Sequence, residues 1–220
     1  DITFVPTYPF NNRDGEDQGD KYSIALVNPL DKVPTLILDD GQGVYASQAI
    51  VECLDSMSKS GKKLYPKSGP LRWDAITRLT IADTIFESTV QLMMECWNPE
   101  DKLRIEFFEW IWPKIFRGMD KLEASCKRGF NDFDIGHAAM LHAISYVDFR
   151  VNFYDAKDAL HPDFNCFENR PNLEAWYKDA MQRPSVTNHY NIDYEGDDSA
   201  EFLQKNVQEV LELQKKNETL

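Results

Sequence analysis

Two short stretches of the sequence decide the fold: residues 28–36, which read NPLDKVPTL, and residues 45–50, which read YASQAI. Pro34 stands at the start of a predicted strand, where it lacks the N–H group that an ordinary ladder needs. If the peptide bond before Pro34 is cis, Val33 presents its N–H and C=O groups sideways, and a small peptide can pair with them as an added strand. The first stretch therefore predicts an edge that binds a peptide-like ligand.

The second stretch places Ser47 at the start of a predicted helix. Apolar residues follow at the spacing of a helix that is buried on one side: Ile50, Cys53, Leu54 and Met57. Ser47 is expected to be the N-cap, and the free N–H groups of a helix start suit a carboxylate. A ligand with an acidic end would satisfy both stretches. A purely structural interpretation, with a rigid strand entry and a helix cap, fits the same residues.

The segments around these stretches predict a small α/β unit. Residues 1–8 alternate like a strand, and residues 21–27 form a short helix that ends before Pro29. Residues 35–38 and 43–45 are predicted strands, joined by a turn with a glycine. Residues 56–70 break all periodicity with two glycines, two prolines and four lysines, which is typical of an exposed domain linker.

Every periodic segment beyond this linker is predicted to be helical. The third helix has the clearest start, because Asn131 can serve as its cap and the acidic Asp132 and Asp134 suit its positive end. A final amphipathic helix over residues 199–215 follows an acidic linker. The predicted helices before it cover residues 71–97, 99–127, 131–152 and 173–181.

Composition excludes several classes of partner. With 24 basic and 37 acidic side chains the formal charge is −13, which repels nucleic acid and anionic lipid surfaces. No apolar run is long enough to span a membrane, and the N-terminus lacks the profile of a signal peptide, so a cytoplasmic location is expected. The four cysteines lie far apart with no histidines at metal spacing, which favours reduced thiols and no metal site.

The two stretches, in this order and spacing, resemble the glutathione site of the cytosolic glutathione transferase superfamily, with a bacterial or fungal character. The resemblance covers the chain to about residue 190. Similar runs in that family match residues 64–66 (LYP), 71–73 (LRW), 134–135 (DI), 146–150 (YVDFR), 170–176 (RPNLEAW) and 183–185 (RPS).

This resemblance implies a thioredoxin-like glutathione-binding domain at residues 1–65 and an all-helical domain at residues 71–220, which includes the extra C-terminal helix. It also implies a homodimer with glutathione as co-substrate. Carried over by position, Val33 before Pro34 gives main-chain hydrogen bonds to the cysteinyl part, Lys32 pairs with the glycyl carboxylate, and Ser47 holds the γ-glutamyl carboxylate.

The sequence departs from the family pattern in two places. Ala46 stands where many members carry an acid, so a partner for the ammonium group of glutathione is missing. Members also begin with a strand and a helix whose connecting loop carries the Tyr, Ser or Cys that acts on the glutathione sulfur. The printed chain begins at the second strand, so the catalytic residue is unknown and we expect it in a preceding segment.

The activity implied is detoxification-type transfer, in which the glutathione thiolate attacks a small hydrophobic electrophile by conjugation, reductive cleavage or isomerisation. Met93, Met94 and Trp97 near the end of the first long helix are candidates for the electrophile pocket, because flexible apolar and aromatic groups line such sites. Packing between helices explains them equally well. The alternative is a non-catalytic glutathione-binding or regulatory protein on the same fold.

Overall fold

A computed structural model describes residues 2–5, 24–130, 132–153, 164–188 and 200–218 of the chain. The chain divides into two compact units. One comprises Asp1–Gly61 together with Asp193–Leu220, and the other comprises Lys62–Ile192. The break between residues 61 and 62 falls inside the predicted linker, which runs from the end of one helix to the start of the next.

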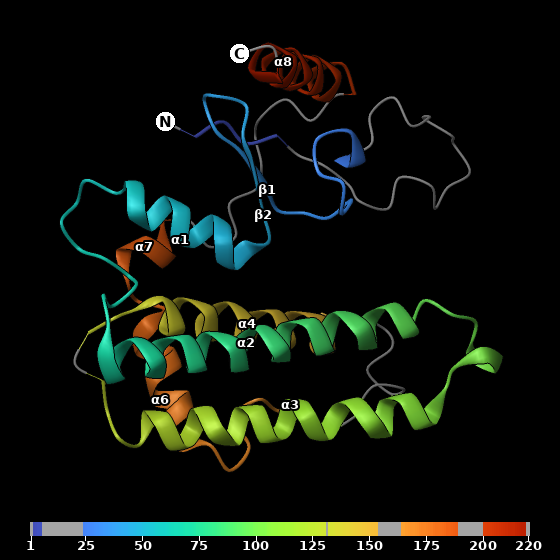
Figure 1. Cartoon of the computed structure of the whole chain (residues 1–220). Helices are drawn as coiled ribbons and strands as arrows, with labels where there is room; N and C mark the ends of the chain where they lie inside the picture. The colour runs from blue at the N-terminus through green and yellow to red at the C-terminus, as the bar shows by residue number, and fades with distance from the viewer. Residues whose placement is uncertain (1, 6–23, 131, 154–163, 189–199, 219–220) are drawn as a thin grey trace. The chain divides into compact units, whose positions relative to one another are not determined.

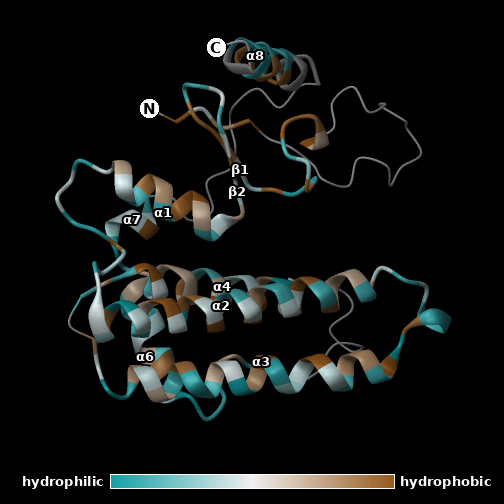
Figure 2. Cartoon of the chain, in the orientation of Figure 1, coloured by the Kyte–Doolittle hydropathy of each residue, from teal (hydrophilic) through white to brown (hydrophobic). Residues whose placement is uncertain are grey.

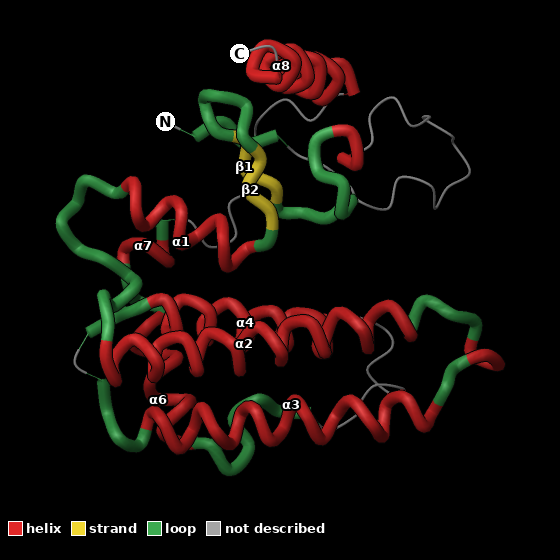
Figure 3. Tube along the Cα trace, viewed as in Figure 1, coloured by secondary structure: helices red, strands yellow, loops and turns green. Residues whose placement is uncertain are grey.

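A β-hairpin and one helix form the centre of the first unit (Figure 3). The hairpin is antiparallel, with Thr35 opposite Tyr45 and Ile37 opposite Gly43. Both predicted strands of the hairpin and the helix after it are confirmed. The elements are a 3-10 turn η2 (Ile24–Leu26), β1 (Thr35–Ile37), β2 (Gly43–Tyr45) and α1 (Ser47–Met57).

Two predictions for the start of the chain need correction. Residues 2–5, expected within a strand, are not part of the sheet, which consists of β1 and β2 in the described part of the chain. The helix expected over residues 21–27 is a single 3-10 turn within the described residues, Ile24–Leu26. Residues 6–8 of the predicted strand lie outside the described residues.

The C-terminal helix α8 (Ala200–Glu218) packs against the turn of the hairpin. Gly41 occupies the turn with a φ of 83°, and a Cβ there would lie 3.1 Å from Cβ of Leu213. The Gln214 side chain donates a hydrogen bond to the Gly41 carbonyl, with Nε2 and O 3.4 Å apart. This contact groups α8 with the first unit, whereas the sequence predicted it within the helical domain at 71–220. The domain boundaries expected at residues 65 and 71 are not tested by this contact and stay a prediction.

Helices alone make up the described part of the second unit (Figure 1). The long helix α2 packs against both α3 and α4, and α3 packs against α6. Gly136 at the start of α4 permits the close approach to α2, because a Cβ there would lie 2.6 Å from the Ala75 carbonyl oxygen. The elements are α2 (Gly69–Glu95), η3 (Glu100–Lys102), α3 (Ile105–Cys126), α4 (Ile135–Phe153), α6 (Pro171–Ala180) and α7 (Pro184–Thr187).

The core of this unit is apolar and continuous across α2, α3 and α4. In Figure 2 each of these helices carries both polar and apolar residues, as expected for helices with one buried face. Burying such side chains stabilises the unit by about 1.5–3 kcal/mol each. The largest fully buried members include Ile85, Leu92, Ile111, Ile115, Met119, Leu122, Met140 and Ile144.

The helix predicted over residues 99–127 is interrupted. The short η3 precedes α3, and Arg104 lies between them. The carboxylate of Glu95 accepts the backbone N–H of Arg104 at 2.9 Å and also binds its guanidinium group. The Glu95 side chain is almost fully buried, so this interaction fixes the connection between α2 and α3. No sequence periodicity indicates such a break, because it depends on a pairing between two elements.

Candidate functional site

The register of the hairpin brings the two predicted ligand-binding stretches to the same end of the sheet. Thr35 pairs with Tyr45, so Pro34, which precedes Thr35, and Ala46, which follows Tyr45, flank the same rung. Ser47 comes next and begins α1. The turn around Gly41, where α8 packs, lies at the opposite end of the hairpin.

The main chain of Val33 is open at this end. The peptide bond between Val33 and Pro34 is cis, the condition under which the sequence predicted a sideways edge. Val33 is 46% exposed, and in residues 24–130 no hydrogen bond engages its N–H or C=O group. Within the described residues these two groups are therefore available to a peptide-like ligand.

The start of α1 corrects the prediction for Ser47. Ala46 is the N-cap and Ser47 is the first helical residue. Ala46 has φ 69° and ψ 135°, a conformation that residues other than glycine rarely adopt. Strained backbone of this kind tends to occur at functional sites. Because the Ala46 side chain cannot cap this helix, the N–H group and the exposed hydroxyl of Ser47 at its start are suited to an anion.

Lys32 completes the set of predicted glutathione contacts in the first unit. Its side chain is exposed, and its carbonyl oxygen accepts hydrogen bonds from Asn28 and Thr35. The fold thus holds the Lys32 main chain while leaving its ammonium group to solvent. Lys32, Val33, Pro34 and Ser47 all lie at the Thr35 and Tyr45 end of the hairpin, as the sequence predicted for a common site.

The three candidates for an electrophile pocket do not share one environment. Met93 is buried, and its sulfur lies 3.8 Å from the Tyr146 hydroxyl oxygen on α4. Met94 is 44% exposed, and Trp97, half-buried, follows the last turn of α2. Phe86 and Tyr146 extend the same surface of α2 and α4, with ring centroids 4.4 Å apart. The pocket assignment remains a prediction.

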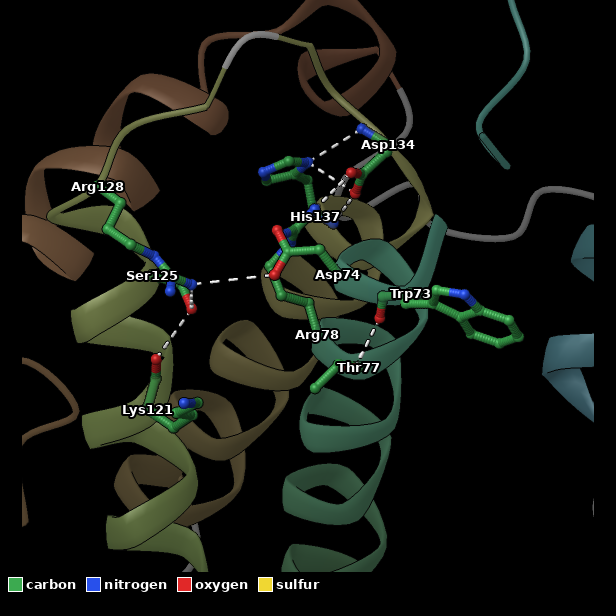
Figure 4. Close-up of polar contacts among 9 residues, drawn as sticks. All are labelled: Trp73, Asp74, Thr77, Arg78, Lys121, Ser125, Arg128, Asp134 and His137. Atoms are coloured by element: carbon green, nitrogen blue, oxygen red, sulfur yellow. Dashed lines mark hydrogen bonds and ion pairs between the residues drawn. The ribbon is translucent and has the colours of Figure 1, made fainter. Parts of the chain in front are cut away.

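A polar cluster in the helical unit was not found from the sequence (Figure 4). The buried Arg78 guanidinium binds both Asp74 and Asp134. Asp134 accepts the backbone N–H of His137 at 3.2 Å, and Nδ1 of His137 accepts the backbone N–H of Asp134 at 3.0 Å. These reciprocal bonds form a capping box at the start of α4 with histidine at the third position.

The cluster replaces the predicted cap. Asn131 lies outside the described residues, and α4 begins only at Ile135, with Asp134 making the cap hydrogen bond. Burial by itself raises the pKa of Asp134, but hydrogen bonding to His137 and the charge of Arg78 lower it below its ordinary value. Since these charges satisfy one another at a helix start, the cluster is structural.

Three of the four cysteines are poor nucleophiles. All four are free thiols, as the sequence predicted. Burial raises the pKa of Cys96 to about 11 and the pKa values of Cys126 and Cys166 to about 12, with a further contribution from a nearby carboxylate in each case. Because the thiolate is the reactive form, these three thiols stay inert at neutral pH.

The described residues contain neither a metal ligand set nor a membrane-spanning helix. No group of three or more histidine, cysteine, aspartate or glutamate side chains there comes together as a metal ligand set. In the same part of the chain, no helix combines the length and the apolar character needed to cross a bilayer.

A hairpin unit with an open cis-proline edge, joined to a helical unit, defines the class of glutathione transferase-like proteins. Comparison with solved structures supports this class. A glutathione transferase family member from Pseudomonas fluorescens Pf-5, with bound glutathione, is 32% identical over 75% of this chain and 76% of its own, with a TM-score of 0.67. The chain therefore belongs to the glutathione transferase family, and the resemblance found in the sequence is confirmed.

Other structures agree with this assignment. A glutathione S-transferase from Methylobacillus flagellatus KT, with glutathione bound, is 26% identical over 75% of this chain and 78% of its own, with a TM-score of 0.64. Gtt2 from Saccharomyces cerevisiae, 22% identical over 80% and 82% of the two chains, shares the fold with a TM-score of 0.59. No family model and no curated protein matches the sequence. The predicted fold class, thioredoxin-like followed by all-α, is confirmed.

Proposed function

We propose that this protein binds glutathione along Val33 and Pro34 and uses its thiolate on a small hydrophobic electrophile. The open peptide groups of Val33 are the observation that carries the proposal. A ligand that itself contains peptide bonds satisfies both groups at once, as an added strand does at a sheet edge. The glutathione bound to the relatives from Pseudomonas fluorescens and Methylobacillus flagellatus supports the same ligand.

The charged ends of glutathione have partners on either side of this edge. Ser47 at the start of α1 offers its hydroxyl and its N–H group to the γ-glutamyl carboxylate. The exposed ammonium group of Lys32 suits the glycyl carboxylate. Pro34 follows the central contact at Val33. In this proposal glutathione binds within residues 1–65.

In this proposal the reacting thiol is that of glutathione. The raised pKa values of Cys96, Cys126 and Cys166 leave these cysteines protonated at neutral pH, so none of them competes as a nucleophile. Activation requires a group that lowers the pKa of the bound glutathione thiol. Conjugation, reductive cleavage and isomerisation all proceed from the resulting thiolate.

The electrophile would be held by the helical domain at 71–220. Met93, Met94 and Trp97 supply flexible apolar and aromatic surface at the end of α2, and Tyr146 adds a hydroxyl beside Met93. A cytoplasmic homodimer with a role in detoxification completes the proposal. The acidic net charge and reduced cysteines are consistent with that location.

Calorimetric titration with glutathione tests the binding half of the proposal. We expect saturable binding that Pro34→Ala weakens, with Pro184→Ala at the start of α7 as a control that leaves binding unchanged. Absence of binding to the folded wild-type protein would refute the glutathione site.

A screen of small electrophiles with glutathione then tests catalysis. Consumption of glutathione above the uncatalysed rate supports the enzyme. Saturable binding without turnover of any electrophile would instead identify the non-catalytic binding protein on the same fold.

A further inference from the structure

Asn28 is the most completely buried polar residue near the candidate site. It has no exposed surface, and its side chain binds the loop that leads to Val33 at three points. Nδ2 donates to the Lys32 carbonyl oxygen at 2.8 Å and to Oγ1 of Thr35 at 2.9 Å, while Oδ1 accepts the N–H of Leu30 at 2.9 Å. An amide that uses both its donors and its acceptor in this way fixes the path of the loop.

Tyr45 holds the same segment from the strand side. Its hydroxyl donates to the Val27 carbonyl oxygen at 2.9 Å, across 18 residues of sequence. The ring lies over Gly43, because a Cβ at that position would come within 2.3 Å of the Tyr45 hydroxyl oxygen. Gly43 therefore provides the space that allows Tyr45 to reach Val27.

Together the two side chains link the two halves of the candidate site. Asn28 holds Lys32 and Thr35 on the first stretch. Tyr45, two residues before Ser47, ties the second stretch to residue 27. Figure 3 shows the loop that they hold, running from η2 into β1. The Asn28 amide is fully buried and the Tyr45 hydroxyl is engaged by Val27, so both act on the loop and not as the proposed ligand contacts.

We propose that Asn28 and Tyr45 are positioning residues for ligand binding, which set the Val33 edge and the Lys32 side chain relative to Ser47. This inference rests on the proposed glutathione site. Since a ligand binds at its two ends and its middle, a shift of the loop by about 1 Å loses several contacts together. Two hydrogen-bonding side chains outside the proposed ligand contacts, one buried and one half-buried, thus determine its affinity.

The test measures glutathione affinity by calorimetry and stability by thermal unfolding for three variants. Tyr45→Phe removes only the hydroxyl, Gly43→Ala displaces the ring, and Asn28→Asp keeps the acceptor for Leu30 while losing the donor to Lys32. Tyr177→Phe is the matched control, because its hydroxyl also makes one side-chain hydrogen bond, to Ser145 at 3.0 Å, in the helical unit.

We expect Tyr45→Phe to weaken glutathione binding about three- to tenfold, the loss that follows from one misplaced hydrogen-bonded segment. Gly43→Ala and Asn28→Asp should weaken binding at least as much, and Tyr177→Phe should leave it unchanged at a similar loss of thermal stability. Variants of Tyr45 and Asn28 that remain folded and bind glutathione like the wild type would overturn the inference while the glutathione site stands.

A double-mutant cycle separates positioning from simple loss of stability. Lys32→Ala should cost less affinity in the Tyr45→Phe background than in the wild type, because the displaced loop no longer presents Lys32 to the ligand. Strictly additive effects in this cycle would contradict the positioning role. Failure of the wild type to bind glutathione is a different outcome, which refutes the proposed function itself.

Discussion

The helix starts of α1 and α4 solve the same problem in opposite ways. At α4 the first N–H groups are satisfied within the protein, because Asp134 and His137 cap one another and Arg78 neutralises the carboxylate. At α1 the cap position holds Ala46 in a strained conformation, without a side chain that can accept a hydrogen bond. One helix start is capped by its own side chains, and at the other the cap residue has no side chain that can do so.

This difference indicates what each helix start is for. At a capped and charge-paired helix start, removing one partner leaves the other group buried without a hydrogen bond or counter-charge. The free-energy cost of that unsatisfied group makes such substitutions destabilising. An uncapped start keeps its N–H groups for an anion from outside. We therefore expect substitutions at α4 to change stability without changing ligand affinity, and substitutions at α1 to do the reverse.

The largest effect should come from Arg78→Leu. Removing this cation leaves the Asp134 carboxylate, 14% exposed, without its arginine partner, and we expect a loss of about 3–5 kcal/mol in the free energy of unfolding. Urea unfolding measures it. Arg117→Leu on the exposed face of α3 is the control, with an expected change within about 0.5 kcal/mol. Equal stability of the two variants would show that the cluster at α4 is not structural.

Ser47→Ala should act on binding alone. A hydrogen bond to a charged group contributes about 1.5–3 kcal/mol, so we expect glutathione affinity to fall by about tenfold or more. Stability should stay close to that of the wild type, because the Ser47 side chain is exposed and does not cap α1. Ser56→Ala near the end of the same helix is the matched control. Calorimetry and thermal unfolding together check the separation.

The capped start of α4 should also make stability depend on pH. The pKa of Asp134 is lowered in the folded state, so its contribution is complete above its ordinary value of 3.8 and is lost as the pH falls further, through the folded value. We expect Asp134→Asn, which retains a capping oxygen, to reduce this acid dependence. Urea midpoints measured between neutral and acidic pH test it, and identical pH profiles would contradict the assignment.

The smallest effect should be a gain in stability at the start of α1. Ala46→Gly relieves a positive φ and should stabilise the protein by up to about 1 kcal/mol. Ala175→Gly on the exposed face of α6 provides the opposite control, with an expected loss of about 0.5–1 kcal/mol. Unfolding experiments in urea compare the two signs. A loss at both positions would mean that Ala46 is unstrained.

The sequence predicted the hairpin and the long helices because those signals are local. The turn with Gly41 between two apolar strands, and the apolar spacing from Ile50 to Met57, depend only on neighbouring residues. The family resemblance supplied the candidate site in the same way, from Val33, Pro34 and Ser47. All three residues lie in short motifs that do not depend on tertiary contacts.

The residues that the sequence did not identify work through partners that are distant in the chain. Arg78 meets Asp134 across 56 positions, and Tyr45 meets Val27 across 18. For Asn28 the sequence indicates only a position before Pro29, where a helix ends. Its three side-chain hydrogen bonds do not follow from any periodicity of the sequence. The residue types also do not indicate that Ala46 has a strained backbone and occupies the cap position in place of Ser47.

By itself, then, the sequence determined the strands of the hairpin, the helices α1 and α2, and the family to which the chain belongs. Periodicity, turn residues and short motifs encode these properties within a few residues of each other. The tertiary structure decided which helix start is capped by side chains, that α8 packs on the hairpin turn, and that Asn28 and Tyr45 hold the edge at Val33. Such properties depend on burial and on pairs brought together only by folding, because a polar group is satisfied by whatever partner the packed chain places beside it.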